Sequence, residues 1–264
     1  MLTRNIYRRL DSQSGFSLIE LAVVLVIIGV VIGSFIGTLN SRIESSRYID
    51  TLSELDDIKV ALYGYAVSKN PPHLPCPDCR TGSCAALTAG NIANDGLEDR
   101  NGIDCDANVD GTLGNLPWHT LGIGDRDAWA NRYSYWVSET VVHDTGTALD
   151  LTTAIISATI NTRTGENIAV LTNAAAAIVL SHGSNNYGAI SVDAVMRPNA
   201  IADDEVENTN NDNVFVSRNI TEPGAVTTSG DDFEFDDVLV WISAYEYKGN
   251  MVQAGVLPKP EPEP

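Results

Sequence analysis

Four cysteines are the residues of this chain whose spacing most directly predicts covalent chemistry. They are Cys76, Cys79, Cys84 and Cys105. All four follow the only long apolar run, and basic residues before that run favour a cytoplasmic N-terminus, so we expect the cysteines in an oxidising compartment. Two disulfides are therefore predicted, out of three possible connectivities. We expect a short Cys79–Cys84 loop nested inside a Cys76–Cys105 loop, because the stiff stretch from Cys76 to Cys79 would be strained as its own pair.

A zinc site and a redox-active pair are the alternatives for these cysteines. The spacing of two, four and twenty intervening residues lacks the second close pair of a zinc ribbon. No βαβ pattern of the thioredoxin type surrounds the Cys-x-x-Cys stretch. Both alternatives stay open, but disulfides fit the spacing better.

A dense run of oxygen-bearing side chains suggests a cation site. Residues 91–110 are half Asp, Asn or Glu, and residues 203–213 and 231–237 are similarly acidic. Part of the first run reproduces the opening of an EF-hand-like loop, but Pro117 stands where the bidentate glutamate belongs. A solvated acidic surface is the simpler interpretation. The alternative is a weak calcium site whose candidate ligands are Asp104, Asp106, Asn108 and Asp110.

The remaining reactive residue types do not form a catalytic pattern. The histidines are scattered, and the sequence holds no H-E-x-x-H, no G-x-S-x-G and no phosphate-binding glycine loop. Ser181 and His182 are adjacent, which on a strand directs their side chains to opposite faces. We therefore expect no enzyme. Packing and loop roles are expected for the histidines, which are His73, His119, His143 and His182.

A single carboxylate interrupts the longest apolar run of the chain. Residues 16–39 read FSLIELAVVLVIIGVVIGSFIGTL, with Glu20 as the one charge. At about 1.5 Å per residue, a helix of this length can cross a bilayer core of roughly 30 Å. The run is too long for an ordinary signal peptide, and no A-x-A site follows it. A carboxylate within a membrane helix is costly and persists mainly where it has a partner or a function, so Glu20 argues against a plain anchor.

The residues at the start of this run form a recognisable motif. From Gly15 to Glu20 the chain reads GFSLIE, after a short basic leader. This stretch resembles the prepilin cleavage motif of type IV pilins and type II secretion pseudopilins. The resemblance implies that a membrane peptidase cuts after Gly15 and methylates the new N-terminal Phe16. It also implies that Glu20 meets the free amine of a neighbouring subunit's Phe16 when the filament assembles.

A long helix is expected to join this motif to the rest of the chain. Apolar residues recur mostly at spacings of three and four from Ile43 to Tyr65, with charged residues between them. The helix should continue to about Ser68, because Pro71 and Pro72 stop it. A helix that is half in the membrane and half an amphipathic spine against a C-terminal sheet is the pilin architecture.

The second half of the chain predicts a small antiparallel sheet with long loops. Several phrases, beginning at Asp127, Ile178 and Phe235, are similar to strand and loop phrases of the major pseudopilin of type II secretion. The tryptophans are expected in the core and on the sheet rather than in a ligand site. Strand-like runs cover Tyr133–Val142, Thr153–Ile160, Ala174–Leu180 and Val238–Tyr247.

The predicted fold class is thus α+β and pilin-like. The expected segments are a leader peptide, a transmembrane helix, the amphipathic periplasmic part of the same helix, a C-terminal globular α+β domain and a disordered proline-rich tail. Their bounds are residues 1–15, 16–39, 40–70, 71–253 and 254–264.

Charge disfavours nucleic acid as a partner and predicts which side of the membrane the N-terminus occupies. The formal net charge is −19, so binding to nucleic acid or to an anionic lipid surface is disfavoured by repulsion. Residues 1–15 carry a local charge of +2, so the residues after Gly15 carry −21. The basic leader is expected to stay in the cytoplasm.

These observations predict a structural subunit, a pilin or pseudopilin and in particular a minor one, of a type IV pilus-like or type II secretion filament. We expect it in the bacterial inner membrane, crossing once, with its C-terminal domain in the periplasm, or outside the cell when in the filament. The expected partners are other subunits, prepilin peptidase and the inner-membrane assembly platform, and not nucleic acid. No cofactor is required, although the resemblance favours Ca²⁺, because major pseudopilins bind calcium in loops of the C-terminal sheet region.

Two other functions remain open. The long loops before Trp118 and between Asp193 and Asp237 are compatible with a tip adhesin or initiator minor pilin, because exposed loops on a scaffold carry recognition. A membrane-anchored periplasmic enzyme is the weaker alternative, since the motifs that would support it are missing from the sequence.

Overall fold

The structure is a computed structural model of the 264-residue chain. It describes residues 17–80, 92–101, 104–105, 113–143, 150–221, 224–226 and 233–257, and within these ranges it describes residues 34–40, 101 and 104 without their side chains. The chain divides into two compact units, residues 1–46 and 47–264.

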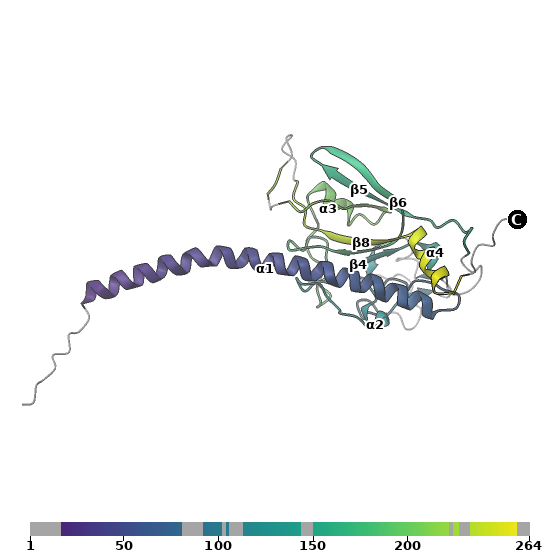
Figure 1. Ribbon diagram of the computed structural model, residues 1–264, viewed down its shortest axis with the longest axis horizontal. Helices are drawn as coiled ribbons and strands as arrows, with labels where there is room; N and C mark the ends of the chain where they lie inside the picture. Colours follow the sequence, from purple (N-terminus) through teal and green to yellow (C-terminus); the bar gives the residue numbers. More distant parts are fainter. Residues whose placement is uncertain are drawn as a thin grey trace, which may run out of the picture. The chain divides into compact units, whose positions relative to one another are not determined.

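One helix, α1 (Leu18–Ser68), runs through the first unit and into the second (Figure 1). Its end at Ser68 confirms the predicted helix and agrees with a stop at the prolines that follow. In the first unit its described apolar side chains are exposed, among them Leu18 at 88% and Val30 at 69%. Across the described residues, no helix combines the length and hydrophobicity that a bilayer crossing requires. The predicted span, residues 16–39, includes side chains outside the described residues and stays a prediction.

The second unit is built on a six-stranded sheet. Five of its strands follow the order β3-β4-β6-β5-β7, and the sixth, β8, pairs with β6. The strands are β3 (Gly114–Asn115), β4 (Ser134–Val137), β5 (Ala158–Thr164), β6 (Asn167–Ser181), β7 (Val214–Val216) and β8 (Val238–Ser243). A separate two-stranded ribbon is formed by β1 (Arg100–Asn101) and β2 (Asp104–Cys105). The helical segments are α2 (Trp118–Leu121), η1 (Glu139–Val141), α3 (Asp203–Glu207) and α4 (Ala244–Gln253).

Strand β6 is the centre of the sheet. It pairs antiparallel with β4 through residues 177–180, with β5 through residues 167–175 and with β8 through residues 175–181. Strand β7 pairs parallel with β5, so the sheet is mixed and not purely antiparallel as predicted. Parallel pairing needs a long connection, and residues 165–213 provide it.

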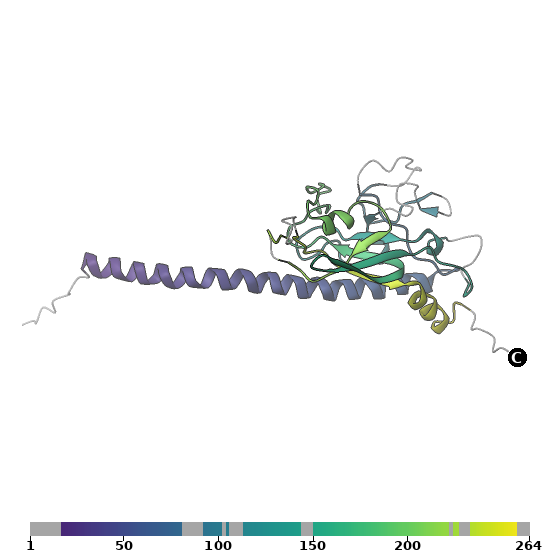
Figure 2. The same ribbon diagram turned by 90° about the horizontal axis from the view of Figure 1, so that it is seen from above.

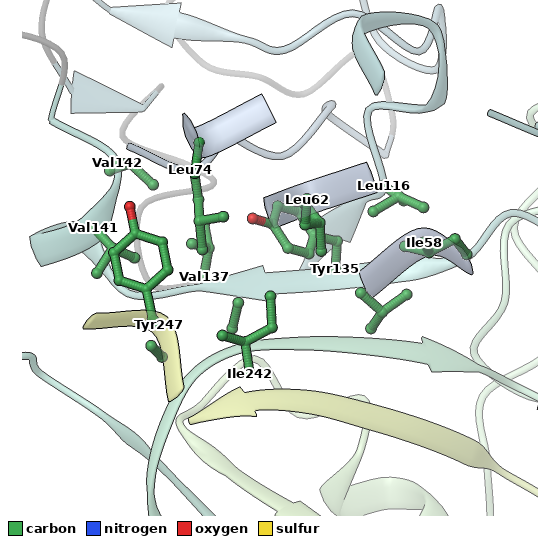
Figure 3. Packing of buried hydrophobic residues seen from close by; sticks show 14 of the residues in the cluster. Ile58, Leu62, Leu74, Leu116, Tyr135, Val137, Val141, Val142, Ile242 and Tyr247 are labelled. Atoms are coloured by element: carbon green, nitrogen blue, oxygen red, sulfur yellow. The ribbon is translucent and has the colours of Figure 1, made fainter. Parts of the chain in front are cut away.

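Side chains that alternate along the strands form two apolar clusters. The first lies between the sheet and the part of α1 that belongs to the second unit. It includes Ile58 and Leu62 of α1, packed with Tyr135 and Val137 of β4 (Figure 3). The second cluster contains the intervening β4 residue, Trp136, with apolar residues of β5 to β8. Each fully buried Leu or Ile stabilises the fold by about 1.5 to 3 kcal/mol relative to exposure.

Polar contacts hold the same stretch of α1 within the second unit. The Tyr65 hydroxyl donates to Glu98 Oε1 at 2.7 Å. Lys59 Nζ lies 2.9 Å from Glu246 Oε1 of α4. Figure 2 shows this stretch of α1 running along the sheet.

Two predicted strands each divide into a strand and a helix. The run Tyr133–Val142 contains β4, which ends at Val137, and then η1, which is capped by the Ser138 side chain accepting the Thr140 N–H. The run Val238–Tyr247 is expected to be a single strand, but β8 ends at Ser243. The Ser243 side chain accepts the Glu246 N–H at 3.1 Å and caps α4. The strand expected at Thr153–Ile160 is also displaced, since β5 begins at Ala158 and continues beyond the predicted end.

The packed part of the second unit extends beyond residue 253, where the sequence predicts that the globular domain ends. Leu257, which falls in the segment expected to be a tail, is buried in the first cluster. Residues 258–264 lie outside the described residues.

Candidate functional site

The first turn of α1 is stabilised by a reciprocal pair of hydrogen bonds. The Glu20 N–H donates to Ser17 Oγ at 3.2 Å, and the Ser17 N–H donates to Glu20 Oε2 at 3.4 Å. This S-x-x-E arrangement is a capping box, which satisfies two N–H groups that a helix start leaves free. It also places the Glu20 carboxylate at the positive end of the helix dipole.

The capping box accounts for part of the role of Glu20 in its own chain. A carboxylate at the head of an apolar helix is already hydrogen-bonded within the first turn. Reasoning from the cost of a charge in a membrane misses this role, although the S-x-x-E spacing signals it. Gly15 and Phe16, the predicted cleavage and methylation residues, lie outside the described residues.

A disulfide joins Cys76 to Cys105, as predicted, with 5.3 Å between the Cα atoms. Cys79 is also disulfide-bonded. Its expected partner, Cys84, lies outside the described residues, so the Cys79–Cys84 pair stays a prediction.

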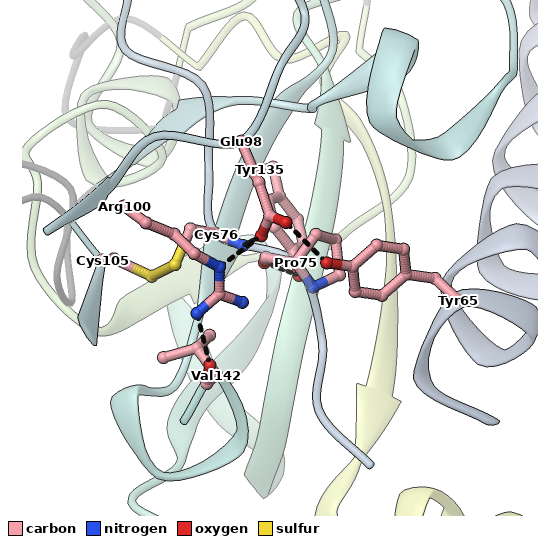
Figure 4. Close-up of a disulfide and its surroundings, with 8 residues drawn as sticks. All are labelled: Tyr65, Pro75, Cys76, Glu98, Arg100, Cys105, Tyr135 and Val142. Carbon is pink, nitrogen blue, oxygen red and sulfur yellow. Dashed lines mark hydrogen bonds and ion pairs between the residues drawn. A yellow bond between two sulfur atoms is a disulfide. The ribbon is translucent and has the colours of Figure 1, made fainter. Parts of the chain in front are cut away.

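Polar side chains surround the Cys76–Cys105 bond (Figure 4). Glu98 Oε2 accepts the Cys76 N–H at 3.1 Å and Arg100 Nε at 2.8 Å. Arg100 also donates to the Val142 carbonyl oxygen at 3.1 Å. The covalent link and these hydrogen bonds therefore hold neighbouring chain segments together.

The predicted EF-hand-like set is mostly outside the described residues. Asp106, Asn108 and Asp110 are not described, and Asp104 is described only as backbone of β2. The calcium prediction for this set therefore stays a prediction.

A second acidic group, formed by Glu205, Asp236 and Asp237, is brought together by the fold. One oxygen from each carboxylate lies within 4.8 Å of the others, and the three residues are 2%, 8% and 5% exposed. Glu205 comes from α3, whereas Asp236 and Asp237 directly precede β8. Both stretches are acidic in the sequence, but no sequence signal shows that these carboxylates meet.

The loop after β6 wraps around Asp236. Asp236 Oδ2 accepts the N–H and hydroxyl of Ser184, both at 2.7 Å, and the Asn185 N–H at 2.8 Å. Gly183 makes this approach possible, because its φ is +58° and a Cβ there would overlap the Asp236 carbonyl oxygen. The Asn185 side chain continues to Glu205 Oε1 at 2.8 Å.

The acidic group is short of hydrogen-bond donors. Glu205 Oε2 and Asp236 Oδ1 are buried and have no hydrogen-bond partner among the described residues. Burial, followed by the nearby Asp237 carboxylate, raises the pKa of Glu205 to about 8, and burial raises the pKa of Asp237 to about 7. Burial likewise raises the pKa of Asp236. The group could hold a metal, and such an all-oxygen set suits a hard divalent cation.

Residue types of a catalytic triad lie next to this group. His182 Nε2 is 2.8 Å from Ser134 Oγ, and His182 Nδ1 is 3.5 Å from Asp237 Oδ1. Ser134 and His182 are 0% exposed, and burial lowers the pKa of His182 to about 3. Arg80 also donates to Ser134 Oγ at 3.1 Å. A hydroxyl enclosed in this way cannot reach a substrate in the folded chain, so the network links β4 to the loop after β6.

Ser181, adjacent to His182, takes part in a different network. Its hydroxyl donates to Asp127 Oδ2 at 2.6 Å, and Asp127 also accepts the N–H groups of Trp129 and Asn131. The two neighbouring side chains therefore serve separate hydrogen-bond networks.

Comparison with known proteins adds one finding, at the N-terminus. Residues 10–36 match the model of the prokaryotic N-terminal methylation motif. No curated protein and no solved structure matches the chain. The matched residues include the capping box of Ser17 and Glu20 and the start of the apolar helix.

Proposed function

We propose that this chain, which carries the N-terminal methylation motif typical of type IV pilins and pseudopilins, is a structural subunit of a type IV pilus-like or type II secretion filament. The observation that carries the proposal is this motif at the head of a long helix with exposed apolar side chains. The pilin-like α+β fold, with α1 against a mixed six-stranded sheet, supports it.

In this proposal prepilin peptidase cuts between Gly15 and Phe16 and methylates Phe16. The basic leader stays in the cytoplasm, residues 16–39 cross the inner membrane, and the globular domain lies in the periplasm. Glu20 then pairs with the amine of a neighbouring subunit during assembly. Membrane burial and helix packing would both cover the apolar side chains that the single chain exposes.

N-terminal sequencing and two substitutions test this proposal. The mature chain should begin at Phe16, and Glu20→Ala should abolish assembly while cleavage continues. Ser17→Ala is the matched control, because it removes the other half of the capping box and keeps the carboxylate. It should weaken the helix start by about 1 kcal/mol and retain assembly. A mature chain that begins elsewhere, or normal filaments from Glu20→Ala, would contradict the proposal.

We assign a minor rather than a major role to the subunit. The support is the long connection between β6 and β7, residues 182–213, in which α3 is the one described helix. Residues 193–196 and 210–213 of this connection are exposed, and exposed loops on a scaffold suit a specialised position in the filament better than a repeated one. Quantifying the chain along isolated filaments tests this assignment, since a major subunit would dominate the mass.

We also propose that Glu205, Asp236 and Asp237 hold Ca²⁺. The support is the pair of buried oxygens, Glu205 Oε2 and Asp236 Oδ1, that have no hydrogen-bond partner among the described residues. A divalent cation would convert the repulsion among three carboxylates into coordination. It would also join α3 to the segment before β8, because the ligands come from both.

Glu205→Gln tests the calcium proposal, because its effect on stability relative to the wild type should be opposite without and with calcium. Without calcium, at a pH above about 8 where Glu205 is ionised, the variant should unfold at a higher temperature than the wild type, because a buried like charge is removed. With calcium at about ten times its dissociation constant, the wild type should gain about 1.4 kcal/mol and the variant much less. Asp203→Asn is the control, since it removes the same charge from an exposed position on α3. Equal gains for the wild type and Glu205→Gln, or equal effects of magnesium, would refute calcium binding at this group.

A further inference from the structure

A pocket of about 350 Å³ lies beside the end of β4. Its volume falls within the range of ligand-binding pockets. Trp136 lines it and belongs to the second apolar cluster, whereas its neighbours Tyr135 and Val137 pack in the first cluster, toward α1. The pocket is therefore on the face of the sheet opposite α1. Its lining residues are Trp136, Ser138, Glu139, Ile156, Asp212 and Asn213.

Hydrogen bonds hold the three chain segments that form the walls of this pocket. Ser138 Oγ accepts the Thr140 N–H at 3.3 Å and caps η1. Thr140 Oγ1 accepts the Ile156 N–H at 3.2 Å, which joins the second segment to η1. The Thr159 N–H of β5 donates to the Asn213 carbonyl oxygen at 2.9 Å and fixes the third segment. The walls are thus in place before a ligand binds, which lowers the entropic cost of binding.

The rim of the pocket is acidic. Glu139 and Asp212 are exposed, and neither carboxylate forms an ion pair in the part of the chain that the structure describes. Asp212 accepts only neutral donors, the Val214 N–H at 2.7 Å and the Asn210 side chain at 3.0 Å. Burial, followed by the charge of Asp212, raises the pKa of the nearby Glu207. No basic residue lines the pocket, so it disfavours an anion and favours a cation.

The remaining surface of the pocket is apolar. Trp136 is 2% exposed and lies deep in the pocket, whereas Ile156 is 54% exposed and borders its opening. A lysine or arginine side chain matches both parts, because its aliphatic stem covers apolar surface while its charged end meets carboxylates. A hydrated metal ion would gain nothing from the apolar part. The lining therefore selects an organic cation with an alkyl chain.

We propose that this pocket receives a lysine or arginine side chain from a different subunit of the filament, an inference that rests on the filament function and the minor role proposed above. A minor subunit is surrounded mainly by other proteins. The chain carries a net charge of −19, so a basic patch on such a neighbour is electrostatically complementary, whereas a second copy is repelled. The pocket also stays accessible when another subunit packs on α1, because it lies on the opposite face of the sheet.

A photo-crosslinking side chain in place of Ile156 tests the identity of the occupant, because this exposed residue borders the pocket. In cells that assemble the full-length chain, irradiation should join it to another subunit of the filament. Mass spectrometry should locate the link next to a lysine or arginine of that subunit. A product of two copies of this chain, or no product from an assembled chain, would overturn the inference.

Glu139→Gln with Asp212→Asn tests the role of the two charges. The pair removes both charges and keeps a side-chain oxygen that can accept the Val214 N–H. The crosslinked product should fall about tenfold, because two partly exposed charge pairs are lost. Asp193→Asn with Asp203→Asn is the control, since it removes the same charge from exposed positions outside the pocket and should leave the product unchanged. An equal fall in both variants would overturn the inference, because the change in net charge would then explain it.

An exchange of charges tests the contact directly. Glu139→Arg should also lower the product, and replacing the crosslinked basic residue of the neighbouring subunit with glutamate should restore it. The thermal midpoint of the Glu139→Arg chain should match the wild type, because Glu139 is exposed. No recovery on exchange would overturn the proposed contact.

These outcomes distinguish the inference from the function on which it rests. A chain that is cleaved and assembled but gives no product at Ile156 would refute the pocket contact and leave the filament function intact. A wild-type chain that is not cleaved at Gly15 and does not assemble would refute both.

Discussion

Removing the Cys76–Cys105 disulfide should lower the free energy of unfolding of the second unit by about 3.6 kcal/mol. The bond closes a stretch with a sequence separation of 29 residues. The chain-entropy relation gives about 12 cal/mol/K for a loop of this size, or about 3.6 kcal/mol at 25 °C. For a unit the size of residues 47–264, this corresponds to a fall of about 7 to 14 °C in the thermal midpoint.

The hydrogen bonds around Glu98 modify this expectation. Glu98 accepts from Cys76 and Tyr65, so it holds the segment near Cys105 to the segment near Cys76 without a covalent bond. Glu98→Gln should therefore cost more in the chain without the disulfide than in the chain with it. The difference should reach about 0.5 to 3 kcal/mol, the range found for residues that share contacts.

The assay is thermal and urea unfolding of residues 47–264 under non-reducing conditions. The four proteins are the wild type, Cys76→Ser with Cys105→Ser, Glu98→Gln, and the combination. A loss below about 1 kcal/mol in the double-serine variant would refute the reasoning, because the denatured chain would then not be restricted by the loop. Strict additivity with Glu98→Gln would show that the two links act independently.

Three further changes test the packing and electrostatics of the second unit. Gly96→Ala should destabilise it by more than about 2 kcal/mol in urea unfolding, since φ is +79° and a Cβ would overlap the Trp118 ring, whereas Gly124→Ala, with nothing within 4 Å, should be neutral. Leu62→Ala, at a side chain that is 1% exposed, should cost about 2 to 5 kcal/mol in the same assay. Burial raises the pKa of Asp78 from 3.8 to about 8, so its contribution to stability is full below its unfolded-state pKa and is lost as the pH rises to about 8. Midpoints measured across this pH range should fall less steeply for Asp78→Asn, and an unchanged slope would show that Asp78 does not titrate there.

The long helix is predictable because its signals are local. Apolar periodicity from Ile43 to Tyr65 and the prolines after it depend on neighbours in sequence, and α1 ends at Ser68 as expected. The strand predicted through Tyr247 fails for a local reason as well. Aromatic residues favour strands, but the cap formed by Ser243 starts a helix there.

Two other differences, at β7 and at the start of β6, depend on long-range pairing. Strand β7 has only three residues, and its parallel pairing with β5 joins Val214 to Thr159. Periodicity carries no information about such a pair. Strand β6 also begins at Asn167, seven residues before the predicted start at Ala174, and this first half is held in the sheet by its pairing with β5.

The candidate sites also differ in whether their signal is local in the sequence or depends on the fold. The motif from Gly15 to Glu20 is contiguous, and a match to residues 10–36 supports it. Glu205 and Asp236 are separated by 31 positions, and their oxygens meet only because the loop after β6 and α3 fold against the start of β8. The sequence identifies acidic stretches, but burial decides which carboxylates need a partner, and burial is a property of the complete fold.

The first apolar cluster has a consequence for the order in which the chain can fold. It joins Leu55, near the start of the second unit, to Met251 and Leu257, near the end of the described residues. Contacts between residues this distant in sequence carry a large loop-closure cost and slow the formation of the core. The domain therefore cannot complete its core until Leu257 has been synthesised. A chain truncated before Leu257 would leave part of this core uncovered and expose it to proteolysis.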